Sequence, residues 1–292
     1  MMRRTGLLVV AVLACGLAFA ATTANAMTLA QLETYTGPIE FKFAMFTTAQ
    51  NTQVGSNEDA WGVGNITSIT DGFNNLWTAG EGGDFLRFII YGIHDYAILP
   101  GNGGSFDIFS IGATGGAADG AIHIDAWRDV TAGNPNAGPA GRTGYSTYAG
   151  ITSGSLWLST VMVSGVKDDD PVTVYDERTA ELFQNAQSTT NPTSGSGVFL
   201  ADVTGGSFGP NLNSPTFARF GTTALADLFG QFTFAPASSA PGCGTGPVST
   251  ACWENKGNDP VIGNAVPEPS ALALLGLGLS LVGLAGFGRR QD

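Results

Sequence analysis

The sequence predicts an all-β fold, an antiparallel β-sandwich or jelly roll with one or two short helices. Two observations lead to this prediction. Apolar residues alternate with polar ones at period two, as at Phe41, Phe43 and Met45, and this spacing places them on one face of a strand. Turn dipeptides such as Asp71-Gly72 and Asn102-Gly103 separate the short apolar runs, where glycine adopts a positive φ at low cost.

Eight segments have the composition of strands, because β-branched and aromatic residues are bounded there by Gly, Asn, Asp or Pro. In chain order they are 41–47, 64–70, 84–92, 105–111, 121–130, 155–164, 197–203 and 228–234. A short helix is expected over 30–35, behind Thr28 as N-cap. A second is expected over 176–187, where Asp176 and Glu177 fall in the first turn.

The chain is expected to divide into four parts. The first 26 residues resemble a secretory signal peptide in their order, since Arg3 and Arg4 precede an apolar run and Ala24-Asn25-Ala26 forms an A-x-A site. We expect export through the Sec translocon and cleavage by signal peptidase after Ala26. Residues 27–234 form the sheet domain, 235–265 a Gly/Pro/Ser-rich spacer, and 266–292 a C-terminal segment.

The composition limits the classes of partner. The chain has 292 residues, 24 of them acidic and 12 basic, with a net charge of −12. Glu268, Asp292 and four arginines lie in the end segments, which leaves the body near −14. An excess of negative charge argues against nucleic acid or an anionic membrane surface as a partner.

Cys243 and Cys252 are the cysteines of the body, and they flank a short Gly/Pro/Thr-rich loop. Export places them in an oxidising compartment, so a disulfide is predicted. Closing so short a loop contributes about 2–3 kcal/mol of stability. Zinc is the weaker alternative, because neither histidine lies nearby and two thiolates do not complete a zinc site.

The C-terminal segment has three consecutive parts. Val266-Pro267-Glu268-Pro269 precedes an uncharged apolar run over 271–287, and Arg289 and Arg290 follow. As a helix the run spans about 25 Å, the short end of what crosses a hydrocarbon core of ~30 Å. A transmembrane helix over 271–287 is therefore predicted, with the basic pair holding the C-terminus in the cytoplasm.

These three parts in this order resemble the PEP-CTERM sorting signal of Gram-negative bacteria. The resemblance covers only the tail, roughly a tenth of the chain. It implies that an exosortase, a membrane transpeptidase-like enzyme, recognises Val266, Pro267, Glu268 and Pro269 as its substrate. It also implies transient anchoring in the inner membrane, delivery to the cell surface or extracellular matrix, and an association with exopolysaccharide. A plain membrane anchor with a chance Pro-Glu-Pro is the alternative.

No complete catalytic set is found in the sequence. Residues 205–209 fit the G-x-S-x-G pattern, but that motif needs a helix directly after it and a later histidine, and His94 and His123 both precede it. His123-Ile124-Asp125 has the spacing of two metal ligands on a strand, but a later second histidine is absent. The sequence therefore predicts a non-enzymatic protein.

Two features suggest ligands. Asp168, Asp169 and Asp170 concentrate negative charge that a structural Ca²⁺ would relieve, and a solvated turn into Pro171 is the alternative. The segment 57–59 offers a weaker version of the same site. Tyr145 and Tyr148 lie in a Gly-rich loop and are candidates for stacking on sugar rings. No other cofactor is expected.

Three functions are compatible with these observations. The leading one is a structural or adhesive protein of exopolysaccharide or biofilm. The alternative is a carbohydrate-binding module that uses loop aromatics. The third is a secreted glycan-acting enzyme, because the acidic body could bring two carboxylates to hydrolytic separation, about 5–9.5 Å.

Overall fold

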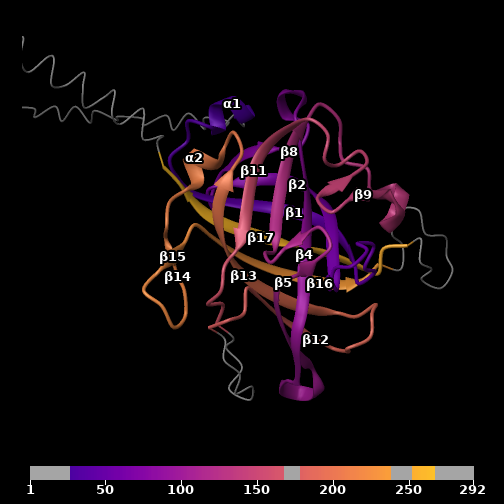
Figure 1. Cartoon of the computed structure of the whole chain (residues 1–292). Coiled ribbons are helices and arrows are strands. Elements are labelled where there is room, and N and C mark those ends of the chain that lie inside the picture. Colours follow the sequence, from indigo (N-terminus) through magenta and orange to yellow (C-terminus); the bar gives the residue numbers. More distant parts are fainter. Residues whose placement is uncertain (1–26, 168–177, 238–251, 267–292) are drawn as a thin grey trace, which may run out of the picture.

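The computed structural model describes residues 27–167, 178–237 and 252–266. An eleven-stranded antiparallel sheet dominates it, in the order β11-β8-β4-β5-β12-β13-β16-β17-β1-β2-β3 (Figure 1). Its strands are β1 (Gly37–Thr48), β2 (Ala60–Thr70), β3 (Asn75–Thr78), β4 (Phe85–Pro100), β5 (Phe106–Gly112), β8 (His123–Asp129), β11 (Ser155–Met162), β12 (Leu182–Ala186), β13 (Gly195–Gly205), β16 (Leu228–Pro236) and β17 (Asn255–Ala265).

Small elements complete the described chain. Three hairpins project from the sheet: β6 (Thr114–Gly115) with β7 (Ala118–Asp119), β9 (Arg142–Gly144) with β10 (Thr147–Tyr148), and β14 (Phe217–Ala218) with β15 (Leu225–Ala226). The helices are α1 (Leu29–Leu32) and α2 (Gly209–Leu212), with 3-10 turns at Glu81–Gly83, Asn102–Gly104 and Pro135–Gly141. Within the described ranges no helix is long and apolar enough to cross a membrane; the span predicted over 271–287 lies outside them.

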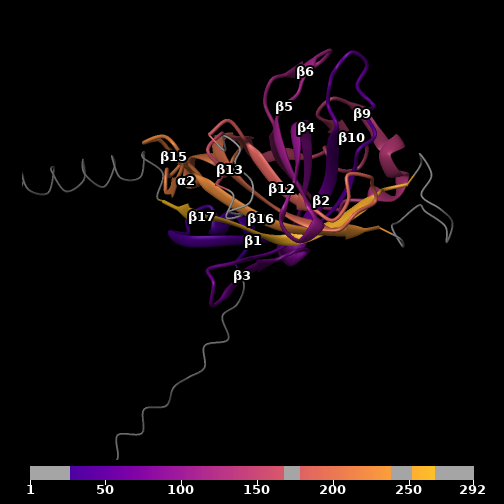
Figure 2. The same cartoon turned by 90° about the horizontal axis from the view of Figure 1, so that it is seen from below.

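The sheet closes on itself, because β2 pairs with β4 and β11 pairs with β13. The first half of β4 pairs with β8 and its second half with β5. The change occurs at Gly92, where φ is +84° and a Cβ would lie 2.3 Å from the carbonyl oxygen of Ala121. Only glycine fits this bend. The wall between β4 and β13 therefore consists of two short pairs, β8–β11 and β5–β12, which follow one another along the length of β4 and β13. Figure 2 shows β16, β17 and β1, which continue the ring from β13.

The main core fills the inside of this ring. In β1, Ile39, Phe41, Phe43 and Met45 are buried and alternate with more exposed residues, as the period-two spacing predicted. A second cluster forms outside the ring around Trp61, Tyr148 and Trp253, and a third around Phe109, Phe183 and Leu200.

The sequence-based elements agree with the structure in most places. All eight predicted strands are present, and the sheet is antiparallel, although its strands form one continuous sheet instead of two separate ones. The first predicted helix is confirmed as α1, and Thr28 and Gln31 form a capping box at its start.

Two segments differ from the prediction. The helix expected over 176–187 is wrong where the structure describes it, because Leu182–Ala186 is strand β12, paired with β5 and β13 on its two edges. Hydrogen bonds on both edges outweigh the weak helix preference of five residues. Asn255–Ala265, assigned to the spacer, is strand β17 between β1 and β16, so the sheet extends to residue 265.

Candidate functional site: a cavity at one end of the ring

A cavity of about 320 Å³ lies at the end of the ring where β1 ends and β2 begins, within the usual volume range of small-molecule sites. Residues of β1, β2, β4, β5, β12, β16 and β17 contribute to its wall, together with the turn after β12. Asn255, the first residue of β17, belongs to this wall. The cavity therefore depends on the closed topology, because no single hairpin carries its lining.

The inner part of the cavity is apolar. Met45, Ile90 and Phe232 line it and also line a second cavity of about 80 Å³ deeper in the ring. The rest of that inner wall is apolar apart from Thr160, and includes Phe41, Phe88 and Leu228. An occupant that enters from the mouth therefore meets hydrocarbon and aromatic surface at depth.

The mouth carries a chain of polar contacts on β4. His94 Nδ1 lies 2.6 Å from Asp59 Oδ2, and the backbone N–H of Asp95 donates to the same oxygen at 2.8 Å. Ser110 Oγ on β5 donates to Asp95 Oδ1 at 2.7 Å. Desolvation by burial raises the pKa of Asp95, the charge of Asp59 adds to the increase, and the hydrogen bond from Ser110 and the charge of His94 oppose it. Asp59 and Asp95 both line the cavity.

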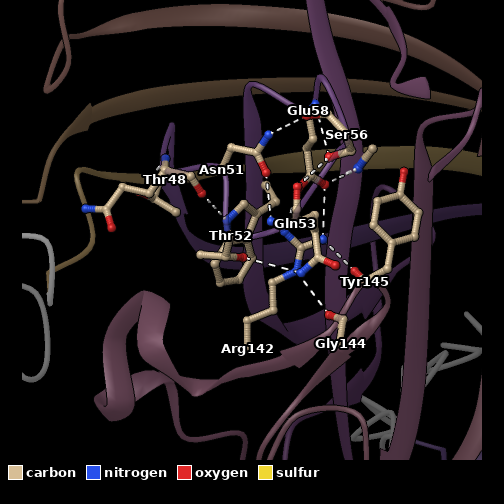
Figure 3. A network of polar contacts seen from close by, with 12 residues as sticks. Thr48, Asn51, Thr52, Gln53, Ser56, Glu58, Arg142, Gly144 and Tyr145 are labelled. Carbon is tan, nitrogen blue, oxygen red and sulfur yellow. Dashed lines mark hydrogen bonds and ion pairs between the residues drawn. The ribbon is translucent and has the colours of Figure 1, made fainter. Parts of the chain in front are cut away.

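The loop between β1 and β2 borders the mouth and is fixed by its own hydrogen bonds. Asn51 accepts from the backbone N–H of Gln53 at 2.7 Å and donates to the carbonyl of Ser56 at 2.8 Å. Glu254 accepts from the backbone N–H of Ala49 at 2.6 Å. Figure 3 shows this loop folded around Glu58, with Arg142 and Tyr145 approaching from the β9–β10 hairpin.

A buried ion pair ties the loop to that hairpin. Arg142 Nη1 lies 2.6 Å from Glu58 Oε2, and both side chains have no exposed surface. Glu58 Oε1 also accepts from the backbone N–H of Gly92 at 2.7 Å. The guanidinium lies 4.5 Å from the ring centroid of Trp61, a cation–π distance. The loop beside the mouth is thus held by a desolvated contact and is preformed.

The tyrosines predicted to bind sugar lie beside this network. Tyr148 is 1% exposed, packs against Trp61 and Trp253, and donates its hydroxyl to the carbonyl of Gly138. Its ring therefore presents no free face to a sugar. Tyr145 is half-buried, and its hydroxyl oxygen lies in the interior with no hydrogen-bond partner. The structure uses both rings in packing.

The two carboxylates of the weaker calcium candidate contact protein groups. Glu58 is paired with Arg142, and Asp59 Oδ2 contacts His94 Nδ1. Asp168, Asp169 and Asp170 lie outside the described residues. In the described ranges there is no group of three or more His, Cys, Asp or Glu that could hold a metal.

The two sequence patterns that suggested chemistry have structural roles. His123 is stacked on Tyr91 at 4.8 Å and hydrogen-bonds Asp119. Asp125 accepts from Tyr91 and Ser159. The turn at 205–209 buries Phe208 against Trp157, with ring centroids 4.5 Å apart, and the short helix α2 follows it.

The remaining predicted sites fall largely outside the described chain. Cys252 is disulfide-bonded; Cys243 lies beyond the described ranges, so the pairing of the two stays a prediction. Of the sorting residues only Val266 is described, and its backbone N–H donates to the carbonyl of Asn211 at 2.7 Å. Ala24, Ala26, Pro267, Glu268, Pro269, Arg289 and Arg290 are not among the described residues.

Residues 265–290 match the family model of the PEP-CTERM protein-sorting motif. This motif indicates an exported protein that passes through the membrane to the cell surface, and it implies processing by an exosortase. No curated protein and no solved structure matches the chain significantly. The motif begins at Ala265, the last residue of β17.

Sequence reasoning missed the cavity. His94-Asp95 directly follows a run of apolar residues, and two polar residues after the buried half of β4 were the available signal. The other contributors, such as Asp59, Gln184 and Asn255, come from distant parts of the chain. Only the closed pairing brings them together, so no local spacing could have shown the site.

Proposed function

We propose that the protein is a non-enzymatic component of the envelope or extracellular matrix of a Gram-negative bacterium, with a structural or adhesive role in exopolysaccharide or biofilm. A signal peptide cleaved after Ala26 and a membrane helix over 271–287 would deliver it to the exosortase. The observation that supports the proposal is the direct continuity of the sorting motif with the centre of the sheet.

The continuity matters mechanically. β17 is paired with β1 over eleven consecutive residues and with β16 on its other edge. Because the hydrogen bonds of an antiparallel ladder run perpendicular to the strands, a pull on residue 266 along β17 loads many bonds at once. A pull perpendicular to β17 would instead open one residue pair at a time. Such an attachment suits a protein that transmits tension between an anchored C-terminus and a matrix.

The first test concerns processing. We expect intact-mass measurement of the native protein from its host to give a C-terminus between Val266 and Ser270, in a fraction outside the inner membrane. Glu268→Gln combined with Pro269→Ala should leave the chain uncut, whereas Glu40→Gln, a matched charge loss on β1 beside Lys42, should be processed normally. A native product that ends at Asp292 and stays in the inner membrane contradicts the proposed sorting.

The second test concerns the structural role. A strain lacking the gene should form a biofilm that loses more biomass under flow shear than the wild type, and the wild-type gene should restore it. The uncut variant should restore less. Equal retention of biomass in the deleted and complemented strains would refute the structural role and leave the sorting result standing.

A further inference from the structure

We propose that the 320 Å³ cavity binds a small organic amine, with the ammonium group beside Asp95 and an apolar body between Ile90 and Phe232. This site is separate from the sorting motif and from the proposed matrix role. It rests on three features of the described residues: the division of the lining, the charge at the mouth and the rigidity of the rim.

The cavity wall is apolar at depth and carries polar groups in its larger part, so it favours an amphipathic ligand. Met45, Ile90 and Phe232 form the passage from the mouth into the inner cavity, so an apolar group gains free energy by leaving water there. The wall of the larger cavity also carries hydroxyl, amide and carboxylate groups, including Gln184 and Asn191, and none of these residues lines the inner cavity. A fully polar ligand such as a free sugar would leave the inner wall unmatched, and a pure hydrocarbon would leave the mouth unmatched.

The charge at the mouth selects a cation. Asp59 and Asp95 line the cavity, and no lysine or arginine does. Elsewhere in the described chain Glu58, Asp84 and Asp129 each have an arginine partner. Asp95 has only the Ser110 hydroxyl on Oδ1, and no described residue donates a hydrogen bond to its Oδ2. Asp95 is half-buried and its Oδ2 remains accessible, so a ligand ammonium in the cavity could pair with this carboxylate.

Asp59 serves mainly to hold β4 in position at the mouth of the cavity. Its Oδ2 already accepts from the Asp95 backbone and contacts His94, so it holds the start of the bent half of β4 in place. It still adds negative potential at the mouth, which disfavours an anionic ligand. The titratable groups near Asp95 are thus Asp59 and His94, and the ammonium binds to Asp95 in preference to either.

The rim is rigid before any ligand arrives. The β1–β2 loop is held by Asn51, by Glu254 and by the buried Glu58–Arg142 pair. Preorganisation lowers the entropy lost on binding. A small ligand can therefore bind measurably without large surface burial.

The test uses three probes with the same apolar body and different heads: phenylbutylamine, phenylbutanol and phenylbutyrate. Each is titrated calorimetrically into the purified full-length chain at neutral pH, with a neutral disaccharide as a fourth probe. We expect the amine to bind in the millimolar range or tighter. The alcohol should bind about 10- to 100-fold more weakly, because a hydrogen bond to a charged group contributes that factor. The carboxylate and the disaccharide should not bind. Equal binding of amine and alcohol overturns the assignment, as does failure of the amine to bind.

Two variants locate the binding. Asp95→Asn keeps the shape and should weaken the amine about 10- to 100-fold while changing the alcohol less than about twofold. Gln184→Trp enters the cavity from a half-buried position and should abolish binding of both. Glu40→Gln is the control for lost charge and should bind as the wild type does. Unchanged amine affinity in Asp95→Asn or in Gln184→Trp places the ligand elsewhere and refutes the proposal. If Asp95→Asn does not fold, Gln184→Trp and the preference for the amine over the alcohol still test whether the amine binds in the cavity.

Discussion

Replacing Arg142 by methionine is expected to destabilise the fold severely, because the change leaves the buried Glu58 carboxyl without its cationic partner. The Glu58 and Arg142 side chains have no exposed surface, and the two contacts between them are 2.6 and 3.0 Å. Without the guanidinium, the carboxylate keeps only the backbone N–H of Gly92 at 2.7 Å. Removing one partner of a buried pair costs about 3–5 kcal/mol, and the lost stacking on Trp61 adds about 1 kcal/mol.

The assay is urea unfolding followed by tryptophan fluorescence, because Trp61 and Trp253 lie in the cluster beside the pair. The midpoint gives the loss of unfolding free energy at constant m-value. The double variant Arg142→Met with Glu58→Gln removes both charges and should recover part of the loss, since no unpaired charge then remains buried. Lys42→Met is the surface control: its contact with Glu40 is 3.5 Å and Lys42 is 53% exposed, so the loss should stay below about 1 kcal/mol. A loss in Arg142→Met no larger than in Lys42→Met would refute the reasoning.

Three further predictions follow from single groups. Burial raises the pKa of Glu181 to about 7 from 4.5, so the folded state holds the proton more tightly and stability falls as pH rises from 4.5 to about 7. After a discount for partial exposure, the unfolding free energy should fall by about 1–2 kcal/mol across this range. Glu181→Gln should remove this pH dependence in unfolding measured over the same range. Gly92→Ala should cost more than about 2 kcal/mol in thermal unfolding, because the new Cβ meets the Ala121 carbonyl at a positive φ, whereas Gly72→Ala, with open space around it, should cost less. Reduction of the Cys252 disulfide should lower the unfolding midpoint by an amount equivalent to about 2–3 kcal/mol, and Cys252→Ser should be insensitive to the reductant.

The strands could be predicted from the sequence wherever burial of one face makes apolar and polar residues alternate along the strand. Phe41 to Met45 in β1 shows this, because one side faces the core and the other does not. β17 lacked this alternation: it contains two glycines, three asparagines and Pro260, all poor strand formers. The structure accommodates Pro260 because the β16–β17 ladder is interrupted between the pairs Gly230–Val261 and Thr233–Asn258. Tertiary pairing with β1 thus fixes a strand that local preference disfavours.

The site could be predicted from the sequence only at the tail. The sorting motif is a contiguous stretch of sequence, so all of its residues lie within residues 265–290. The cavity is the opposite case, since Asp59, Asp95, Gln184 and Asn255 are separated by long intervals and meet only through closure. Tyr148 illustrates the related error: a tyrosine in a Gly-rich segment suggested exposure, but the segment folds back over Trp61 and Trp253 and buries it.

β17 relates the two functional ends of the molecule. Its first residue, Asn255, lines the cavity mouth, and its last residue, Ala265, begins the sorting motif. An eleven-residue strand separates these points by about 35 Å. While the C-terminal segment holds the chain at a membrane or at another attachment point, the cavity mouth therefore lies at the far end of the ring. The sorting motif begins at the opposite end of the same strand, so the proposed processing of the tail and the proposed binding at Asp95 concern separate ends of the ring. We therefore expect loss of the tail to leave the affinity of the cavity unchanged.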